Sequence, residues 1–186
     1  MAPIGPTSLQ TRLVPMAVSR QMISVVAGET FSWASGSWTE LSVTGPAGTG
    51  NLAYDAKTSQ LIFLGQPDVT NGPCSTWSWN GVRWRPLTPT HEPPSGQGLA
   101  SLAYDTTSTQ LLYVAAVGAT TQTEETWMWS GDNWAEMAPV SSPPPRNDAA
   151  LAYDSATRDL ILFGGYVVTS SQLLRLDDTW QWDGSN

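Results

Sequence analysis

Short apolar runs separated by polar turns make up most of the chain after about residue 20. The runs are about four or five residues long, are rich in β-branched or aromatic side chains, and are bounded by Gly, Pro or Asp, as at residues 61–64. Runs of this kind predict buried β-strands. No segment keeps the 3.6-residue period of an amphipathic helix. The pattern therefore predicts an all-β protein.

The runs belong to a unit that repeats at intervals of about fifty residues. Each clear copy opens with Leu-Ala-Tyr-Asp, which places Tyr54, Tyr104 and Tyr153 at equivalent positions. A polar turn, a second apolar run, a long polar loop and Thr-Trp-x-Trp follow, and two copies add a further Trp after a Gly. A degenerate copy precedes them. All 10 tryptophans fall at these positions: Trp33, Trp38, Trp77, Trp79, Trp84, Trp127, Trp129, Trp134, Trp180 and Trp182.

Each copy is expected to form four strands, at about 51–54, 60–64, 76–80 and 83–87 in the first clear copy. Asp55 and its counterparts Asp105 and Asp154 are expected to accept backbone N–H groups two residues on and so close the first hairpin. A four-stranded unit with two apolar faces cannot bury both faces alone, so we expect the units to stack on one another.

Three motifs resemble those of bacterial kelch repeats: Ala-Tyr-Asp at 152–154, Leu-x-Leu-Phe-Gly-Gly ending at Gly164 and Gly165, and Asp-Thr-Trp-x-Trp-Asp-Gly at 178–184. The resemblance covers about residues 20–186. It implies a β-propeller with four-stranded antiparallel blades. Because propellers have about four to eight blades and this sequence supplies about four, we expect a partial propeller.

The repeat also predicts the boundaries of the blades. They are a poorly defined N-terminal segment at 1–20, a degenerate first blade at 21–48, a second at 49–97, a third at 98–148, and a fourth at 149–186 that lacks its last strand. Two such chains would make an eight-bladed ring, so a homodimer that completes the ring is one expected assembly.

Charge and composition exclude several classes of partner and site. A net charge of −8 repels phosphate backbones and anionic lipid, so nucleic acid and membranes are not expected partners. One cysteine, Cys74, and one histidine, His91, cannot build the common multi-Cys or multi-His metal centres, and no cofactor is expected. The first twenty residues lack a signal-peptide pattern. The compartment stays open, with a secreted or cell-surface bacterial location favoured over the cytoplasm.

The long connections are expected to share one face of the molecule. In a four-stranded meander, the loops between strands 2 and 3 and the loops to the next unit lie at the same end, and these loops are the long ones here. Binding residues concentrate on long loops carried by a rigid scaffold. Each charge among them could equally be an ordinary solvated loop residue, and Arg146 could equally anchor its unit. The candidates are Asp68, Asn71, His91, Glu92, Glu124, Glu125, Arg146, Arg175 and Asp177.

The sequence thus predicts a non-catalytic propeller segment that binds a protein partner through this long-loop face, the commonest role of the proteins it resembles. Two alternatives remain open. One is a carbohydrate-binding propeller, and the other is a fragment of a larger secreted enzyme whose catalytic residues lie outside the chain. Within these residues there is no Gly-x-Ser-x-Gly nucleophile motif.

Overall fold

A computed structural model describes residues 14–16, 21–26, 28–66, 73–96, 100–118, 122–169 and 172–186. These residues form strands β1 to β17, and none of them lies in a helix. Every strand pair is antiparallel. The prediction of an all-β protein is confirmed.

Four sheets follow one another along the chain, and each is ordered as a meander. The first contains β1 (Val14–Met16), β2 (Gln21–Val26), β3 (Glu29–Ala34) and β4 (Ser37–Leu41). The second contains β5 (Gly50–Asp55), β6 (Gln60–Gly65), β7 (Ser75–Trp79) and β8 (Trp84–Pro86). The third contains β9 (Ser101–Asp105), β10 (Gln110–Val117), β11 (Thr123–Trp129) and β12 (Trp134–Met137).

The fourth sheet has three strands, β13 (Ala150–Asp154), β14 (Asp159–Phe163) and β17 (Thr179–Trp182), so β17 is an edge strand. Between β14 and β17 the chain forms a separate hairpin of β15 (Tyr166–Val168) and β16 (Leu173–Arg175). This segment was expected to be a loop, and that expectation is wrong. The first sheet takes β1 from inside the N-terminal segment that the sequence left undefined.

The aspartate turns form as expected at the first hairpin of three sheets. The Oδ1 atoms of Asp55, Asp105 and Asp154 accept N–H groups two residues on, at 2.9, 2.8 and 2.8 Å. Each turn then closes through a residue with positive φ, at Ser59, Thr109 and Arg158. The carboxylate provides each turn with an acceptor for a backbone N–H group. Because the aspartate recurs at the same position, the same turn forms in these three sheets.

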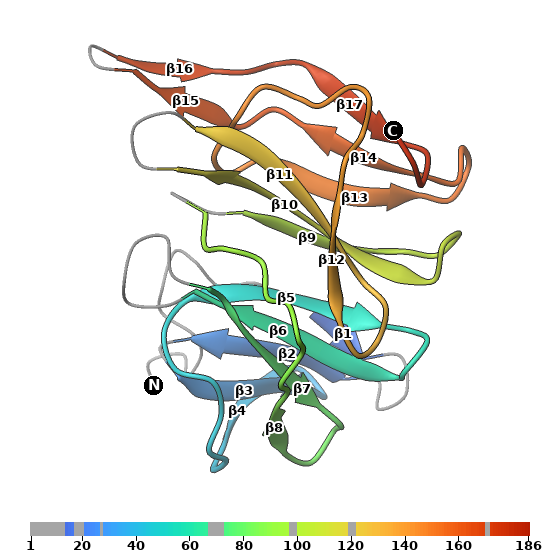
Figure 1. Ribbon diagram of the computed structural model, residues 1–186. Coiled ribbons are helices and arrows are strands. Elements are labelled where there is room, and N and C mark those ends of the chain that lie inside the picture. The colour runs from blue at the N-terminus through green and yellow to red at the C-terminus, as the bar shows by residue number, and fades with distance from the viewer. Residues whose placement is uncertain are drawn as a thin grey trace.

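The core lies between successive sheets. Figure 1 shows the sheets stacked on one another, and the opening strands β5, β9 and β13 lie side by side. Each of the three interfaces holds its own apolar cluster. Representative residues are Ile23 with Phe63 and Trp84, Leu64 with Tyr113 and Trp134, and Val114 with Leu162 and Trp182. Each inner sheet therefore buries both of its faces against neighbours, as expected from its apolar pattern.

Cross-strand tryptophan pairs recur within the sheets. Trp79 and Trp84 are paired residues of β7 and β8 with ring centroids 5.3 Å apart, and Trp129 and Trp134 repeat the arrangement at 5.2 Å. Aromatic pairs at such distances stabilise a sheet beyond their buried area. The repeated tryptophans are thus structural.

Candidate functional site

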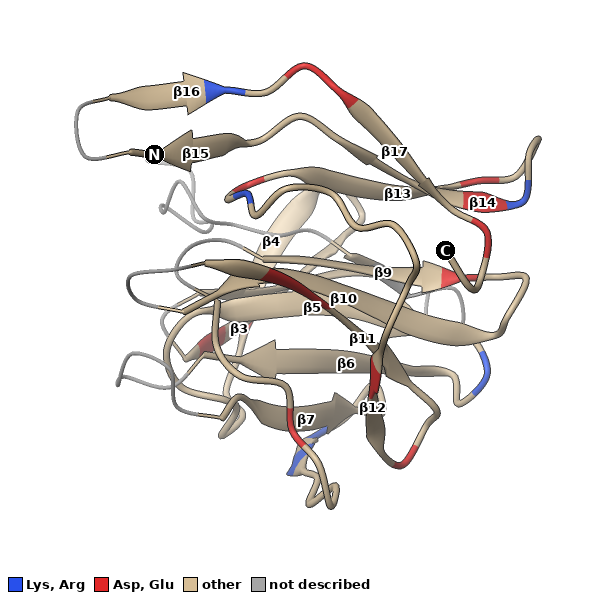
Figure 2. Ribbon diagram, turned by 45° about the horizontal axis from the view of Figure 1, so that its top comes forward, with Lys and Arg blue, Asp and Glu red and all other residues tan. Residues whose placement is uncertain are grey.

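A projecting hairpin marks the face expected to carry the site. Figure 1 shows β15 and β16 extending past the third and fourth sheets, at the end where β10 finishes and β11 begins. Figure 2 shows a basic position at the end of β16, followed by acidic positions along the segment leading to β17. These positions include Arg175 and Asp177, two predicted binding residues, and both are exposed. They remain available to a partner.

Arg146 lies in the interior instead. Its side chain is 1% exposed and forms a two-pronged ion pair with Asp178, Nη1 to Oδ1 at 2.6 Å and Nη2 to Oδ2 at 2.9 Å. It also donates to the carbonyl oxygens of Pro144 at 3.1 Å and Gly164 at 3.0 Å. The hydrogen bonds that Arg146 donates to Asp178 hold the pKa of the Asp178 carboxyl well below its ordinary value, and the hydrogen bond from the Trp180 indole lowers it further. The sequence left two roles open for Arg146, binding a partner and anchoring its unit. These buried contacts match the anchoring role.

The double glycine belongs to the same cluster. Gly164 and Gly165 both have positive φ, at +69° and +93°, a conformation that glycine adopts without strain. A Cβ on Gly165 would lie 2.7 Å from the Asn147 carbonyl oxygen. Close backbone approach is thus required here, and the Gly164 carbonyl accepts a hydrogen bond from the Arg146 guanidinium.

Glu124 and Glu125 are both half-buried and both have structural partners. The Arg146 backbone N–H donates to Glu124 Oε2 at 3.2 Å, yet burial outweighs this bond and raises the pKa of Glu124 to about 8. With its pKa raised, this carboxyl offers a basic partner less charge than an exposed glutamate would. Glu125 Oε2 accepts the indole N–H of Trp127 at 2.9 Å, as Asp178 does from Trp180.

Glu92 and His91 form hydrogen bonds with residues that are not among the predicted binding residues. The Glu92 carboxylate accepts the backbone N–H of Thr76 at 3.1 Å and its hydroxyl at 2.6 Å, and burial raises its pKa. His91 is exposed, but its backbone N–H donates to Asn133 Oδ1 at 3.0 Å, in the short turn between β11 and β12. That turn is a connection between strands 3 and 4, the type expected at the opposite end. Asp68 and Asn71 lie outside the described residues.

Apolar side chains of the hairpin were missed as candidates. Val168, Leu173 and Leu174 are 62%, 52% and 42% exposed, and Phe163, at the end of β14, is 52% exposed. The signal was present in the sequence, because two short apolar runs flank a brief polar stretch, which is a hairpin pattern. Large apolar side chains left exposed on a folded protein favour contact with another protein.

The described part of the chain lacks the side-chain cluster that a metal site needs. It holds no group of three or more His, Cys, Asp or Glu side chains arranged to bind a metal ion. None of its residues forms a helix long and apolar enough to span a membrane. Cys74 is buried, and burial raises the pKa of its thiol to about 12, which keeps it in the unreactive thiol form.

Comparison of the sequence with models of known families gives no match, and comparison with curated proteins gives none either.

Proposed function

We propose that the chain is a segment of a kelch-like β-propeller and binds a protein partner, without catalysis, through the long-loop face that carries the β15–β16 hairpin. The propeller part is supported by four successive meander sheets whose opening strands lie side by side. In a propeller, the opening strand of each blade lies nearest the central axis and next to its equivalents. The described sheets do not by themselves form a closed ring.

The observation that carries the binding proposal is the exposed apolar surface of the hairpin. Of the large apolar side chains that are exposed in the described residues, Phe163, Val168, Leu173 and Leu174 come from one stretch of chain. Protein interfaces combine apolar side chains with charged ones, and this stretch of chain exposes both kinds, the charged ones being Arg175 and Asp177.

The carbohydrate alternative lacks a matching observation. Binding sugars by stacking requires an aromatic ring with an open face. Five of the tryptophans are buried, the other five are half-buried, and none is exposed. The tryptophans are better explained by the cross-strand pairs and the interfaces between sheets. The possibility of catalytic residues in a longer protein stays a prediction.

Site-specific photocrosslinking tests the proposal in the cells that make the protein. A photoreactive residue at Leu173 is compared with one at Val82, which is equally apolar and 74% exposed but lies in the turn between β7 and β8. We expect a discrete protein adduct from position 173, absent from position 82 and lost when Leu174→Lys is added. The same adducts from both positions, or none from 173, would overturn the proposal.

A further inference from the structure

The turn between β7 and β8 carries an Asn-Gly pair, at Asn80 and Gly81. Both residues are exposed to solvent. Gly81 has a φ of +94°, a conformation that glycine adopts without strain. The turn joins Trp79 to Trp84, which are paired residues of the two strands, so both of its ends are held in place. The chain therefore presents an accessible Asn-Gly pair on a fixed support.

The hydrogen bonds of this turn engage the Asn80 side-chain oxygen and leave two nitrogen atoms free. Asn80 Oδ1 accepts the backbone N–H groups of Val82 and Arg83, both at 3.0 Å. The Asn80 side-chain nitrogen and the Gly81 backbone nitrogen form no hydrogen bond with any described residue. Donors that point at a carbonyl oxygen stabilise the negative charge that develops there when a nucleophile adds to the carbon. The two N–H groups on Oδ1 therefore favour addition to Asn80 Cγ.

The Gly81 backbone nitrogen is the nucleophile next to Cγ along the chain, and glycine has no side chain to obstruct the attack. As this nitrogen bonds to Cγ, the bond from Cγ to the side-chain nitrogen breaks, and ammonia leaves with the proton of the Gly81 N–H. The product is a cyclic succinimide, which water opens. Cleavage between the Gly81 nitrogen and Cγ gives aspartate, and cleavage between that nitrogen and the main-chain carbonyl carbon of Asn80 gives isoaspartate.

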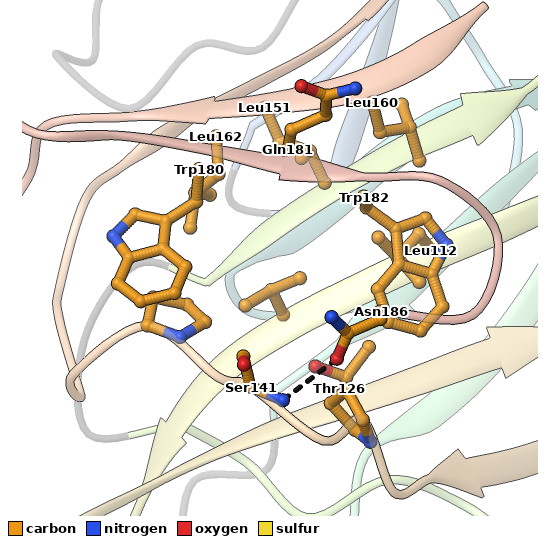
Figure 3. A pocket seen from close by; sticks show the side chains of 13 residues that line it. Leu112, Thr126, Ser141, Leu151, Leu160, Leu162, Trp180, Gln181, Trp182 and Asn186 are labelled. Atoms are coloured by element: carbon orange, nitrogen blue, oxygen red, sulfur yellow. Dashed lines mark hydrogen bonds between the residues drawn. The ribbon is translucent and has the colours of Figure 1, made fainter.

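The fourth sheet shows how an aspartate fits the same turn. Asp183 follows the last residue of β17, as Asn80 follows the last residue of β7. Asp183 Oδ1 accepts the backbone N–H groups two and three residues on, from Ser185 and Asn186, both at 2.9 Å. Asn80 Oδ1 makes the same two bonds in its own turn. Figure 3 shows Trp182 and Asn186, which flank the fourth-sheet turn. An aspartate at position 80 can thus keep the hydrogen bonds of the asparagine.

We propose that Asn80 is a site of spontaneous deamidation in the folded protein, through a succinimide with Gly81, and that the turn retains the aspartate product. The reaction needs water as its only co-reactant, and asparagine is among the thermolabile residues. It adds a negative charge beside Arg83 and Arg85, two exposed side chains that form no ion pair within the described residues. Deamidation therefore lowers the positive charge of this turn. The reaction is independent of the hairpin function proposed above.

The test incubates the whole folded chain in mildly alkaline buffer, in parallel with a free peptide that has the sequence of residues 76–85. Digestion and tandem mass spectrometry follow the conversion of the Asn80 amide to a carboxyl group. We expect the folded chain to convert at a rate within about tenfold of the free peptide, which is a difference in barrier of at most about 1.4 kcal/mol. An Asn80 amide that survives while the free peptide converts fully would overturn the proposal.

The same digest contains two comparisons. Asn133 precedes the bulky Trp134 in the equivalent turn of the third sheet, so it is the internal control and should remain an amide. The other Asn-Gly pair, which begins at Asn71, lies outside the described residues, and its fragment is quantified separately. Low concentrations of urea, below the unfolding transition, should leave the Asn80 rate nearly unchanged. A steep rise would assign the reaction to unfolded chains and overturn the proposal.

Two variants test the position and the product. Asn80→Ser copies Ser130, which occupies the same position in the third sheet, and it should abolish the conversion at this turn. Asn80→Asp has the structure of the aspartate product and should unfold at the same urea concentration as the unaltered protein. A lower midpoint for Asn80→Asp would contradict retention of the product by the turn.

Discussion

Replacing Asp178 by asparagine isolates the charge that balances Arg146. The side chain keeps its size, and with its oxygen in the Oδ2 position it still accepts hydrogen bonds from Arg146 Nη2 and Trp180 Nε1. Its amide group then faces Nη1, the atom that lies 2.6 Å from Oδ1 in the ion pair. The guanidinium, 1% exposed, is left with neutral carbonyl partners only.

The magnitude follows from the burial of the two partners. Removing one partner of a buried ion pair costs about 3–5 kcal/mol because the other charge stays uncompensated. Asp178 is 41% exposed, so water already screens part of the attraction. We therefore expect the free energy of unfolding to fall by about 2–3 kcal/mol. For a chain of this length, the midpoint of thermal unfolding should fall by about 4–12 °C.

Urea unfolding at neutral pH measures this loss, and Asp177→Asn is the control because Asp177 is adjacent and exposed. The control should change stability by less than about 0.5 kcal/mol. Because the pKa of Asp178 is lowered by folding, its contribution is complete above its ordinary pKa of 3.8 and is lost as the pH falls below that value. The two proteins should therefore converge in acid. Equal losses for the two variants would refute the role assigned to the ion pair.

Three further predictions concern the interfaces and Glu124. Thr76→Val removes the hydroxyl that bonds to both Trp134 and Glu92, although Glu92 keeps the backbone N–H of residue 76. Thr30→Val removes the hydroxyl partner of Trp84 alone. Urea unfolding should therefore show a larger loss of stability for Thr76→Val, about 2–4 kcal/mol against about 1–2. A Cβ on Gly45 would lie 2.8 Å from Trp84 Cδ1 and 3.3 Å from Thr30 Oγ1, so Gly45→Ala should cost about 1–3 kcal/mol in the same assay. Because folding raises the pKa of Glu124 from 4.5 to about 8, the folded state binds the extra proton and stability declines as pH rises through that window. Between pH 5 and pH 9, the urea midpoint of Glu124→Gln should therefore fall less than that of the unaltered protein.

The repeat made most of the strands predictable. Tyr54, Tyr104 and Tyr153 recur in step with the tryptophans, so one assignment of strands serves each copy. The stacking of the sheets could be predicted because each apolar run has large side chains on both faces of its strand. The β15–β16 hairpin was missed although its two apolar runs have a hairpin pattern, because its strands of 3 residues each were counted as part of a long loop.

The chemistry of the candidate residues was less accessible to sequence reasoning. Arg146 and Asp178 are 32 positions apart, and only the folded path of the chain shows that they pair. Glu92 and Glu124 were predicted as binding residues that could equally be solvated charges, whereas both are half-buried and accept hydrogen bonds from within the fold.

The affinity of the purified crosslinking partner for three forms of the chain tests the binding surface most directly. The forms are the unaltered protein, Leu174→Lys in the hairpin, and Val82→Lys in the exposed turn at the opposite end. Burying a lysine charge in an apolar contact should weaken binding at least about tenfold for Leu174→Lys, and Val82→Lys should bind like the unaltered protein. Equal affinity of all three forms would contradict binding through the hairpin.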